Sequence, residues 1–334
     1  MRRQRASTRR RPAILRAATH AAAAAALLGA ALLAAAGPAR ADRLCVAADP
    51  RAPCSLPGGT YHVRTPDGAG PFPAVVVLHS AGETGADIVN DPFYVGMVLG
   101  RGFALVAPTG LPQRYADGSV LPGWHVRQTS TGGRDDAAFI AAAIEVAAQA
   151  FQIDRRRVLL TGWGNGASLA WEIACTAPAT ASAYAPMNGG FYAPLPARCR
   201  APVRLMQVHG RDNGFWPLDA GEQRAARGTA RPVPVADHLA FARRLGGCGE
   251  AGPPDPGLPW GLELTRWRGC QSGADLAFLL HDEGGGLSSG VFGAVLDWFL
   301  PPAPPTRIAP PGVGSVFRRP GEATGAFGKR PPGQ

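Results

Sequence analysis

Lysine is almost absent from this sequence. Lys329 is the single lysine among 34 basic residues, and every other basic residue is arginine. Charged residues make up only 17% of the 334 residues and aromatic residues 7%, whereas 46% are hydrophobic. Such a composition excludes a chain that is disordered throughout. With 44 glycines, 33 prolines and long alanine runs, the preference for arginine reflects a compositional bias and carries no functional information.

Acidic residues are missing from the N-terminal segment and scarce at the C-terminus. Residues 1–41 contain eight arginines and no acid, and residues 301–334 contain five basic residues and one acid. The segment between them carries 21 basic and 23 acidic residues, a net charge of −2, although the whole chain has +10. A protein that binds nucleic acid keeps its positive charge on the folded domain, so we expect no nucleic-acid partner.

The N-terminal segment has the pattern of an export signal. Seven arginines in residues 1–16 precede a run of Ala, Leu and one Gly over residues 21–36, and ARA at 39–41 fits a cleavage site. This pattern predicts a signal peptide over residues 1–41, by either the general secretory or the twin-arginine route. The run is shorter than a membrane span of about 20 residues. We therefore expect a secreted or periplasmic protein without a membrane span after cleavage.

Two further boundaries follow from composition. Residues 301–334 hold nine prolines and six glycines and predict a disordered tail. Residues 42–300 remain as one domain, which we expect to be monomeric.

The cysteine pattern contains no C-x-x-C pair, which argues against a zinc site, and we expect neither a metal nor another cofactor. All six cysteines follow the predicted cleavage site, and an even number in an oxidising compartment predicts disulfides. We predict sequential pairing, which joins Cys45 to Cys54, Cys175 to Cys199 and Cys248 to Cys270.

Strand-like and helix-like segments alternate within the domain. Continuous apolar runs predict strands buried on both faces, at 74–79, 103–107, 157–161, 203–208 and 276–280. Amphipathic patterns predict helices at 135–151, 167–175 and 291–300. This alternation predicts an α/β fold with a mostly parallel sheet and helices on both faces. Functional sites in such sheets form at the carboxyl ends of the strands.

The glycine-rich turn in residues 159–168, LLTGWGNGAS, lies between a predicted strand and a predicted helix. Two motifs fit that context, the dinucleotide fingerprint GxGxxG/A and the nucleophile elbow GxSxG of α/β-hydrolases. A dinucleotide site also requires an acidic residue about 20 positions later. Residues 178–193 contain none, so we favour the elbow.

From about Gly59 to Leu300 the chain resembles the secreted polyhydroxybutyrate depolymerase and feruloyl esterase family. The matching stretches occur in the same order along the chain, at 73–82, 135–140, 153–158, 162–174 and 202–217. The resemblance implies an α/β-hydrolase fold and a serine esterase with a Ser-His-Asp triad.

The three triad positions implied by the resemblance are all substituted. The family elbow GxSNG is GWGNG here, which places Gly164 at the nucleophile position. HGRDNGFWP at 209–217 places Asn213 at the acid position, with Asp212 one residue out of register, and EGGGLS at 283–288 places Leu287 at the base position. Glycine cannot attack a carbonyl and leucine cannot accept a proton, so this set predicts a pseudoenzyme with a binding or scaffolding role.

The alternative is an active esterase or depolymerase that uses displaced residues on short-chain hydroxyacid polyesters or aromatic esters. The candidate substitutes are Ser80 in the oxyanion loop, Asp212 and His281. On either hypothesis a ligand of unknown identity occupies the old ester pocket, which we expect to be lined by Ser80, Trp163, Asn165 and Trp216.

Overall fold

The computed structural model describes the central part of the chain. The described residues are 52–115, 118–127, 133–220, 230–255, 258–259, 261–271, 273–282 and 287–300. The predicted signal peptide and the predicted C-terminal tail lie outside them.

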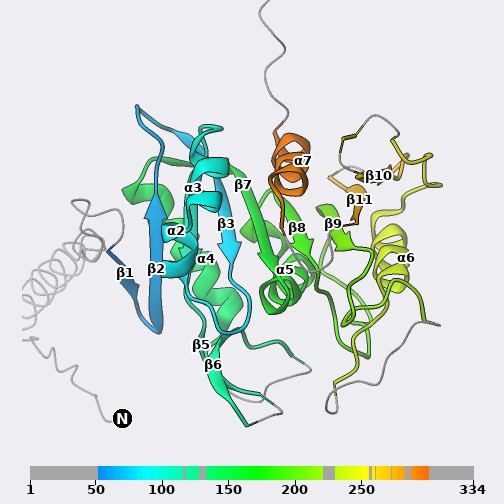
Figure 1. The fold of residues 1–334 in the computed structure, drawn as a ribbon, viewed down its shortest axis with the longest axis horizontal. Coiled ribbons are helices and arrows are strands. Elements are labelled where there is room, and N and C mark those ends of the chain that lie inside the picture. Colours follow the sequence, from blue (N-terminus) through cyan, green and yellow to red (C-terminus); the bar gives the residue numbers. More distant parts are fainter. Residues whose placement is uncertain are drawn as a thin grey trace, which may run out of the picture.

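A twisted sheet of nine strands forms the centre of the described chain (Figure 1). Its order is β1-β2-β4-β3-β7-β8-β9-β11-β10. The strands are β1 (Cys54–Leu56), β2 (Gly59–Arg64), β3 (Phe72–Leu78), β4 (Ala104–Pro108), β7 (Ile153–Trp163), β8 (Ala183–Met187), β9 (Arg204–Gly210), β10 (Glu263–Arg266) and β11 (Asp275–His281). Six neighbouring strands, from β4 to β11, run parallel, while β1, β2 and β10 pair antiparallel at the edges. This is the predicted α/β-hydrolase fold.

Helices cover both faces of the sheet. One face packs against α4 (Asp136–Ala150), α5 (Asn165–Thr176) and α6 (Val235–Gly246). The other packs against α2 (Gly85–Asn90), α3 (Pro92–Leu99) and α7 (Ser289–Phe299). Side chains alternate along the central strands. Val76 and Leu160 enter the first core, between the sheet and α4, α5 and α6. Val75 and Leu159 enter the second core, between the sheet and α2, α3 and α7. Both faces of the parallel strands are therefore buried, which explains their continuous apolar sequences.

The five predicted strands and three predicted helices are all present, with small shifts at their ends. Pattern analysis did not predict the edge strands, the strand β8, the helices α2, α3 and α6, or the hairpin formed by β5 (Leu111–Arg114) and β6 (Val120–Gly123). The hairpin lies at the carboxyl edge of the sheet in Figure 1.

Disulfides connect Cys175 to Cys199 and Cys248 to Cys270, which confirms two of the three predicted pairs. Cys54 is also disulfide-bonded, whereas its predicted partner Cys45 lies outside the described residues. No helix in the described part of the chain is long and apolar enough to cross a membrane.

Arg134 connects three segments of the chain. Its side chain is 9% exposed and pairs at 2.6 Å with Asp136, which is 1% exposed. The same guanidinium donates to the carbonyl oxygens of Gly58 and Thr109 and lies 3.7 Å from the ring centroid of Phe139. The start of α4 is thereby tied to the turn between β1 and β2 and to the segment that follows β4.

We expect Arg134→Ala to lower the free energy of unfolding by about 3–5 kcal/mol, because it leaves the Asp136 carboxylate buried without its cation. Urea denaturation monitored by circular dichroism measures the loss. Arg101→Ala is the matched control, since Arg101 pairs with Asp297 at 3.5 Å on the surface, and it should cost less than about 1 kcal/mol. Equal losses in the two variants would contradict the assigned role of Arg134.

Candidate ligand site at the strand-to-helix elbow

The predicted elbow is present at the carboxyl end of β7. Trp163 ends the strand, Asn165 begins α5, and Gly164 between them has φ 53° and ψ −111°. The Gly164 amide donates to the carbonyl of Met187. A Cβ atom added at Gly164 would meet one described atom within 4 Å, Ser80 Oγ at 3.1 Å. The position therefore has the backbone of a nucleophile elbow and no side chain, and a Cβ atom there would be in tight contact with the Ser80 hydroxyl.

Close packing of α5 against β3 fixes the elbow. A Cβ atom at Gly166 would lie 2.2 Å from the carbonyl oxygen of Leu78 and 2.6 Å from that of His79. Gly162 approaches the same Leu78 oxygen, which a Cβ would meet at 2.8 Å. Neither position has room for a side chain, so both glycines are required by the approach of the helix, independently of any reaction.

Asn165 and His79 hold the loops around the elbow. The Asn165 amide pairs with the backbone of Trp124 in both directions, at 2.7 and 3.2 Å. His79 Nδ1 donates to the Ser80 carbonyl, and His79 Nε2 accepts from the Gly110 amide at 2.8 Å. Burial lowers the pKa of His79, consistent with this neutral form. With both nitrogens engaged, His79 supports the loop and cannot act as a base for Ser80.

Ser80 is half-buried, and its backbone amide donates to the exposed Glu83 carboxylate at 2.8 Å. Its hydroxyl makes no hydrogen bond to any residue that the structure describes. Ser168, one turn into α5, donates to the Gly164 carbonyl at 3.3 Å, a helix back-bond with no catalytic geometry.

The acid position lies in the loop after β9, in the chain order of a hydrolase triad. Asn213 is half-buried, and its Oδ1 accepts from the amides of Phe215 and Trp216 at 2.9 and 3.0 Å. The side chain therefore stabilises a turn. Asp212, the displaced carboxylate, is exposed to solvent.

The base position follows β11. Leu287 is half-buried against the second apolar core and provides no titratable group. His281 is the last residue of β11 and is fully buried. Beyond it, the Asp282 carboxylate is paired at 2.8 Å with Arg211, which also pairs with Glu263 at 2.7 Å. Asp282 is therefore engaged in a surface ion-pair network.

Three buried side chains near the acid position have unsatisfied polar atoms, a feature that sequence patterns did not reveal. They are Asn188 Nδ2, His209 Nδ1 and Trp216 Nε1, for which no partner exists among the described residues. Asn188 Oδ1 accepts from the Gly210 amide at 2.7 Å, which leaves the Asn188 NH2 group as the unsatisfied donor. Burial lowers the pKa of His209 to about 4, so this imidazole is neutral at pH 7.

Aromatic side chains from the loops after β8 and β9 form a cluster. The ring of Trp216 lies 5.4 Å from that of Tyr192 and 4.5 Å from that of Phe215, and Phe215 is 45% exposed. Of the predicted pocket residues, Trp216 belongs to this cluster, whereas half-buried Trp163 packs against the second core.

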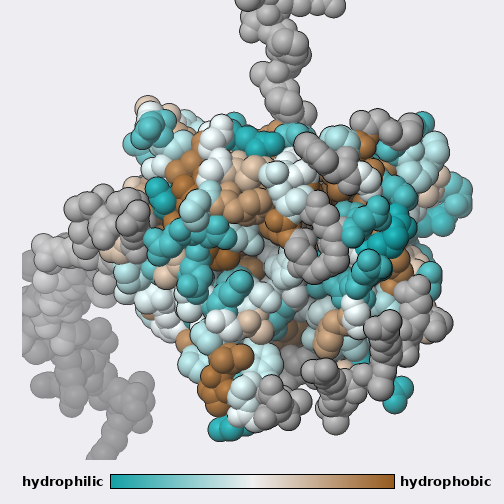
Figure 2. Space-filling view, viewed as in Figure 1, coloured by the Kyte–Doolittle hydropathy of each residue, from teal (hydrophilic) through white to brown (hydrophobic). Residues whose placement is uncertain are grey.

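The hairpin of β5 and β6 forms an apolar rim, because it exposes hydrophobic side chains to solvent. Val120 and Leu121 of β6 are exposed, and Figure 2 shows an apolar patch where Figure 1 places the hairpin. A Cβ atom at Gly82 would lie 3.7 Å from Leu121, so this rim adjoins the loop that carries Ser80.

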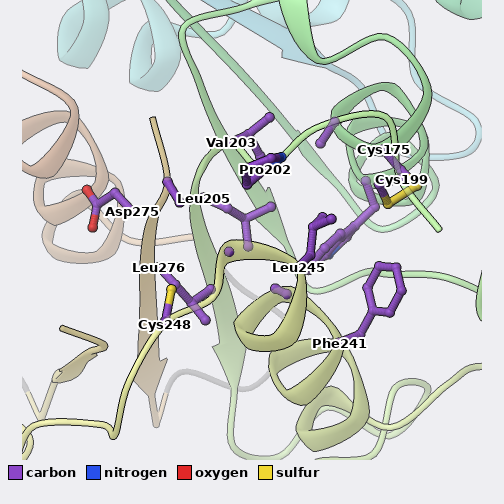
Figure 3. Close-up of a pocket in the computed structure, with 15 residues that line it drawn as sticks. Cys175, Cys199, Pro202, Val203, Leu205, Phe241, Leu245, Cys248, Asp275 and Leu276 are labelled. Atoms are coloured by element: carbon purple, nitrogen blue, oxygen red, sulfur yellow. A yellow bond between two sulfur atoms is a disulfide. The ribbon is translucent and has the colours of Figure 1, made fainter. Parts of the chain in front are cut away.

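Two hollows lie away from the elbow. An apolar cavity of about 30 Å³ lies between α5, α6 and the amino-terminal halves of β9 and β11, at the opposite end of the strands, and both described disulfides border it (Figure 3). A polar hollow of about 380 Å³ lies beside α5 and includes His125, Arg127 and Glu172. Burial raises the pKa of Glu172, which accepts from the Arg127 amide at 2.8 Å. The described residues contain no group of three or more side chains suited to a metal ion.

Comparison with known proteins finds esterases at low identity. No family model matches the chain. The chain is 25% identical over 178 residues to "Probable feruloyl esterase C" of Aspergillus niger, a match that covers 51% of this chain and 60% of that protein. It is 22% identical over 226 residues to "Feruloyl esterase D" of Neurospora crassa, covering 66% and 71%.

The search of solved structures finds an acetyl xylan esterase from Aspergillus awamori, with 17% identity and a TM-score of 0.48 over 72% of this chain and 93% of that one. A Bacillus cereus carboxylesterase has 14% identity and a TM-score of 0.46 over 72% and 93%. The strand order described above establishes the α/β-hydrolase fold independently, and the sequence similarity is to esterases.

We expect Gly166→Ala to destabilise the protein by about 3 kcal/mol or more, because its methyl group would overlap two backbone oxygens that cannot rotate away. Gly96→Ala is the matched control. Gly96 lies within α3, a Cβ there meets nothing within 4 Å, and alanine should stabilise that helix by about 0.5–1 kcal/mol. Thermal unfolding of both variants distinguishes the two effects. A small loss for Gly166→Ala would show that α5 can move away from β3.

Proposed function

We propose that this protein is an exported esterase-like α/β-hydrolase-fold protein that binds a ligand at its elbow without hydrolysing it. The observation that carries this proposal is Gly164, which has the strained elbow backbone and no side chain. A serine at this position would have to adopt a positive φ, which costs a non-glycine residue about 1–3 kcal/mol. Glycine relieves that cost where no nucleophile is required.

The other two triad positions support the proposal. Asn213 provides an amide that is engaged in its own turn, and Leu287 provides a packed aliphatic side chain. Acyl transfer by this route needs an oxygen nucleophile, a base within hydrogen-bond reach and an acid that orients the base. Ser80 has a hydroxyl beside the elbow, yet the adjacent imidazole of His79 is fully engaged with the backbone.

We expect no covalent adduct with a serine-directed fluorophosphonate and no hydrolysis of p-nitrophenyl butyrate above a heat-treated control. Intact mass spectrometry of the secreted protein measures the first result and absorbance measures the second. Stoichiometric labelling at Ser80, or at any other serine, would support the displaced-residue esterase and reject the pseudoenzyme.

Restoring the nucleophile alone should not restore an esterase, because triad members act as a unit. We expect Gly164→Ser to stay within about tenfold of the background rate, and the triple variant Gly164→Ser, Asn213→Asp, Leu287→His to exceed it by at least about tenfold. Initial rates with p-nitrophenyl butyrate provide the measurement. High activity of the single variant would mean that a histidine already serves as base, with His281 as the first candidate.

A further inference from the structure

The charged side chains of the described chain are divided between the two ends of the parallel strands. The amino edge of the sheet consists of the first residues of these strands, the end of antiparallel β10, the last turns of α6 and α7, and the neighbouring loops. In Figure 1 this edge lies at the end of the sheet opposite the hairpin of β5 and β6. The arginines at the amino edge are Arg101, Arg155, Arg156, Arg157, Arg198, Arg200, Arg204, Arg243, Arg244, Arg266 and Arg268.

The acidic side chains at the amino edge are fewer, and most of them are paired with these arginines. The ion pairs join Arg101 to Asp297, Arg155 to Glu145, Arg156 and Arg157 to Asp154, Arg204 to Asp275, and Arg243 to Glu250. Exposed Asp67, in the loop before β3, has no arginine partner among the described residues. The remaining arginines therefore give this edge a net positive charge.

Five exposed arginines at the amino edge form no ion pair with any described residue. These free arginines are Arg198, Arg200, Arg244, Arg266 and Arg268. They lie on the loop before β9, the end of α6, the end of β10 and the loop that follows it.

The two described disulfides hold the segments that carry the free arginines. Cys199 lies between Arg198 and Arg200 and is bonded to the end of α5 at Cys175. The bond between Cys248 and Cys270 joins the segment after α6 to the loop after β10. Both bonds border the small apolar cavity at this edge (Figure 3). The free arginines are therefore carried by backbone of fixed position.

The opposite, carboxyl edge of the sheet is acidic. Its acidic side chains include Glu83, Asp135, Asp136, Asp212, Glu263 and Asp282. Two of its arginines, Arg134 and Arg211, are paired with these acids. Because residues 42–300 carry a net charge of only −2, the charge of the whole domain conceals this division between the two edges.

The chain beyond α7 starts from the basic edge. Asp297 pairs with Arg101, and the Trp298 carbonyl accepts from Arg204 at 3.4 Å. The last described residue, Leu300, therefore lies at the amino edge. Residues 301–334 follow it with five basic residues and one acid, so their charge adds to that of the edge from which they start.

We propose that the amino edge of the sheet is a docking surface for a membrane of anionic phospholipids, which leaves the elbow at the opposite edge facing solution. From exposed Arg156 on β7 to Arg266 on β10 the charges cross four strand-to-strand steps, about 20 Å. Arg244 lies in the helix layer beside the sheet, so the charges cover an area and not a single line. Such a spread fits a planar array of phosphate headgroups better than one small anion.

The chemistry of this edge favours a reversible, electrostatic attachment. The exposed large hydrophobic side chains of the described chain are Val120, Leu121 and Phe215, and all three lie toward the carboxyl edge. The basic edge thus offers charge without an apolar anchor that would insert between lipid tails. Basic residues close to an anionic membrane surface are attracted within about a Debye length, and salt screens that attraction.

Co-sedimentation with lipid vesicles tests the proposal on the chain without its predicted signal peptide. The vesicles consist of phosphatidylcholine with or without about 30% phosphatidylglycerol, in about 50 or about 500 mM NaCl. We expect at least about tenfold stronger partitioning onto the anionic vesicles at the lower salt concentration, and loss of that preference at the higher one. The triple variant Arg244→Gln, Arg266→Gln, Arg268→Gln should weaken partitioning at least about tenfold, and removal of residues 301–334 about threefold.

The triple variant Arg114→Gln, Arg127→Gln, Arg231→Gln is the matched control. It removes the same charge from exposed positions toward the carboxyl edge, and it should change partitioning less than about twofold. Circular dichroism shows whether both triple variants are folded. If the amino-edge variant is not, the pair Arg198→Gln, Arg200→Gln repeats the test on a separate segment of the same edge.

Several outcomes would overturn the docking surface. Equal weakening by the two triple variants would show that net charge alone governs binding. No preference for anionic vesicles, or binding that is lost with residues 301–334 and unaffected by the amino-edge variants, would also reject it. Retention on soluble heparin without vesicle binding would assign the edge to an acidic polysaccharide and reject the membrane. None of these results bears on the proposed loss of hydrolysis, which the fluorophosphonate and p-nitrophenyl butyrate measurements test separately.

Discussion

The contact between α5 and the end of β3 is the constraint on which the rest of the site depends. Gly162 and Gly166 allow the helix to approach the backbone oxygen of Leu78 more closely than any side chain would permit. That approach fixes the turn between them, and the turn fixes the conformation of Gly164. None of these contacts involves a hydroxyl, an imidazole or a carboxylate. The elbow can therefore keep its shape when the groups that perform acyl transfer are missing, because packing maintains it.

The central fold could be predicted because most central strands contain an apolar run that is buried on both faces of the sheet. The same analysis did not detect β8, whose sequence AYAPM includes a proline that pattern rules exclude from a central strand. Pro186 is accommodated opposite Gly162 in the parallel ladder with β7. The antiparallel edge strands are short and half-exposed, so they lack the apolar run that identified the others.

The elbow could be predicted because it lies between a central strand and a helix, and the predicted acid and base positions follow from the order of the strands that precede them. The polar groups that surround the elbow could not be predicted from the sequence. Asn188 lies 24 residues beyond Gly164, in a segment with no motif, and its significance depends on a left-handed backbone and an unsatisfied NH2 group. The amide pair between Asn165 and Trp124 spans 41 residues of sequence. Such long-range contacts leave no periodic signal in a single sequence.

The buried polar groups in and beside the loop after β9 carry information that the predicted triad positions do not. An unsatisfied buried donor costs about 1–3 kcal/mol, and a fold freed from catalysis would gain stability by replacing it with an apolar residue. Asn188 and Trp216 each retain such a donor, and His209 retains an unsatisfied ring nitrogen. Packing alone would favour their loss, as it favours glycine at the elbow. Asn188 Oδ1 accepts from the Gly210 amide and His209 Nε2 donates to the Trp216 carbonyl, so each side chain also holds the backbone around the loop that follows β9, a structural role that an apolar residue could not take over.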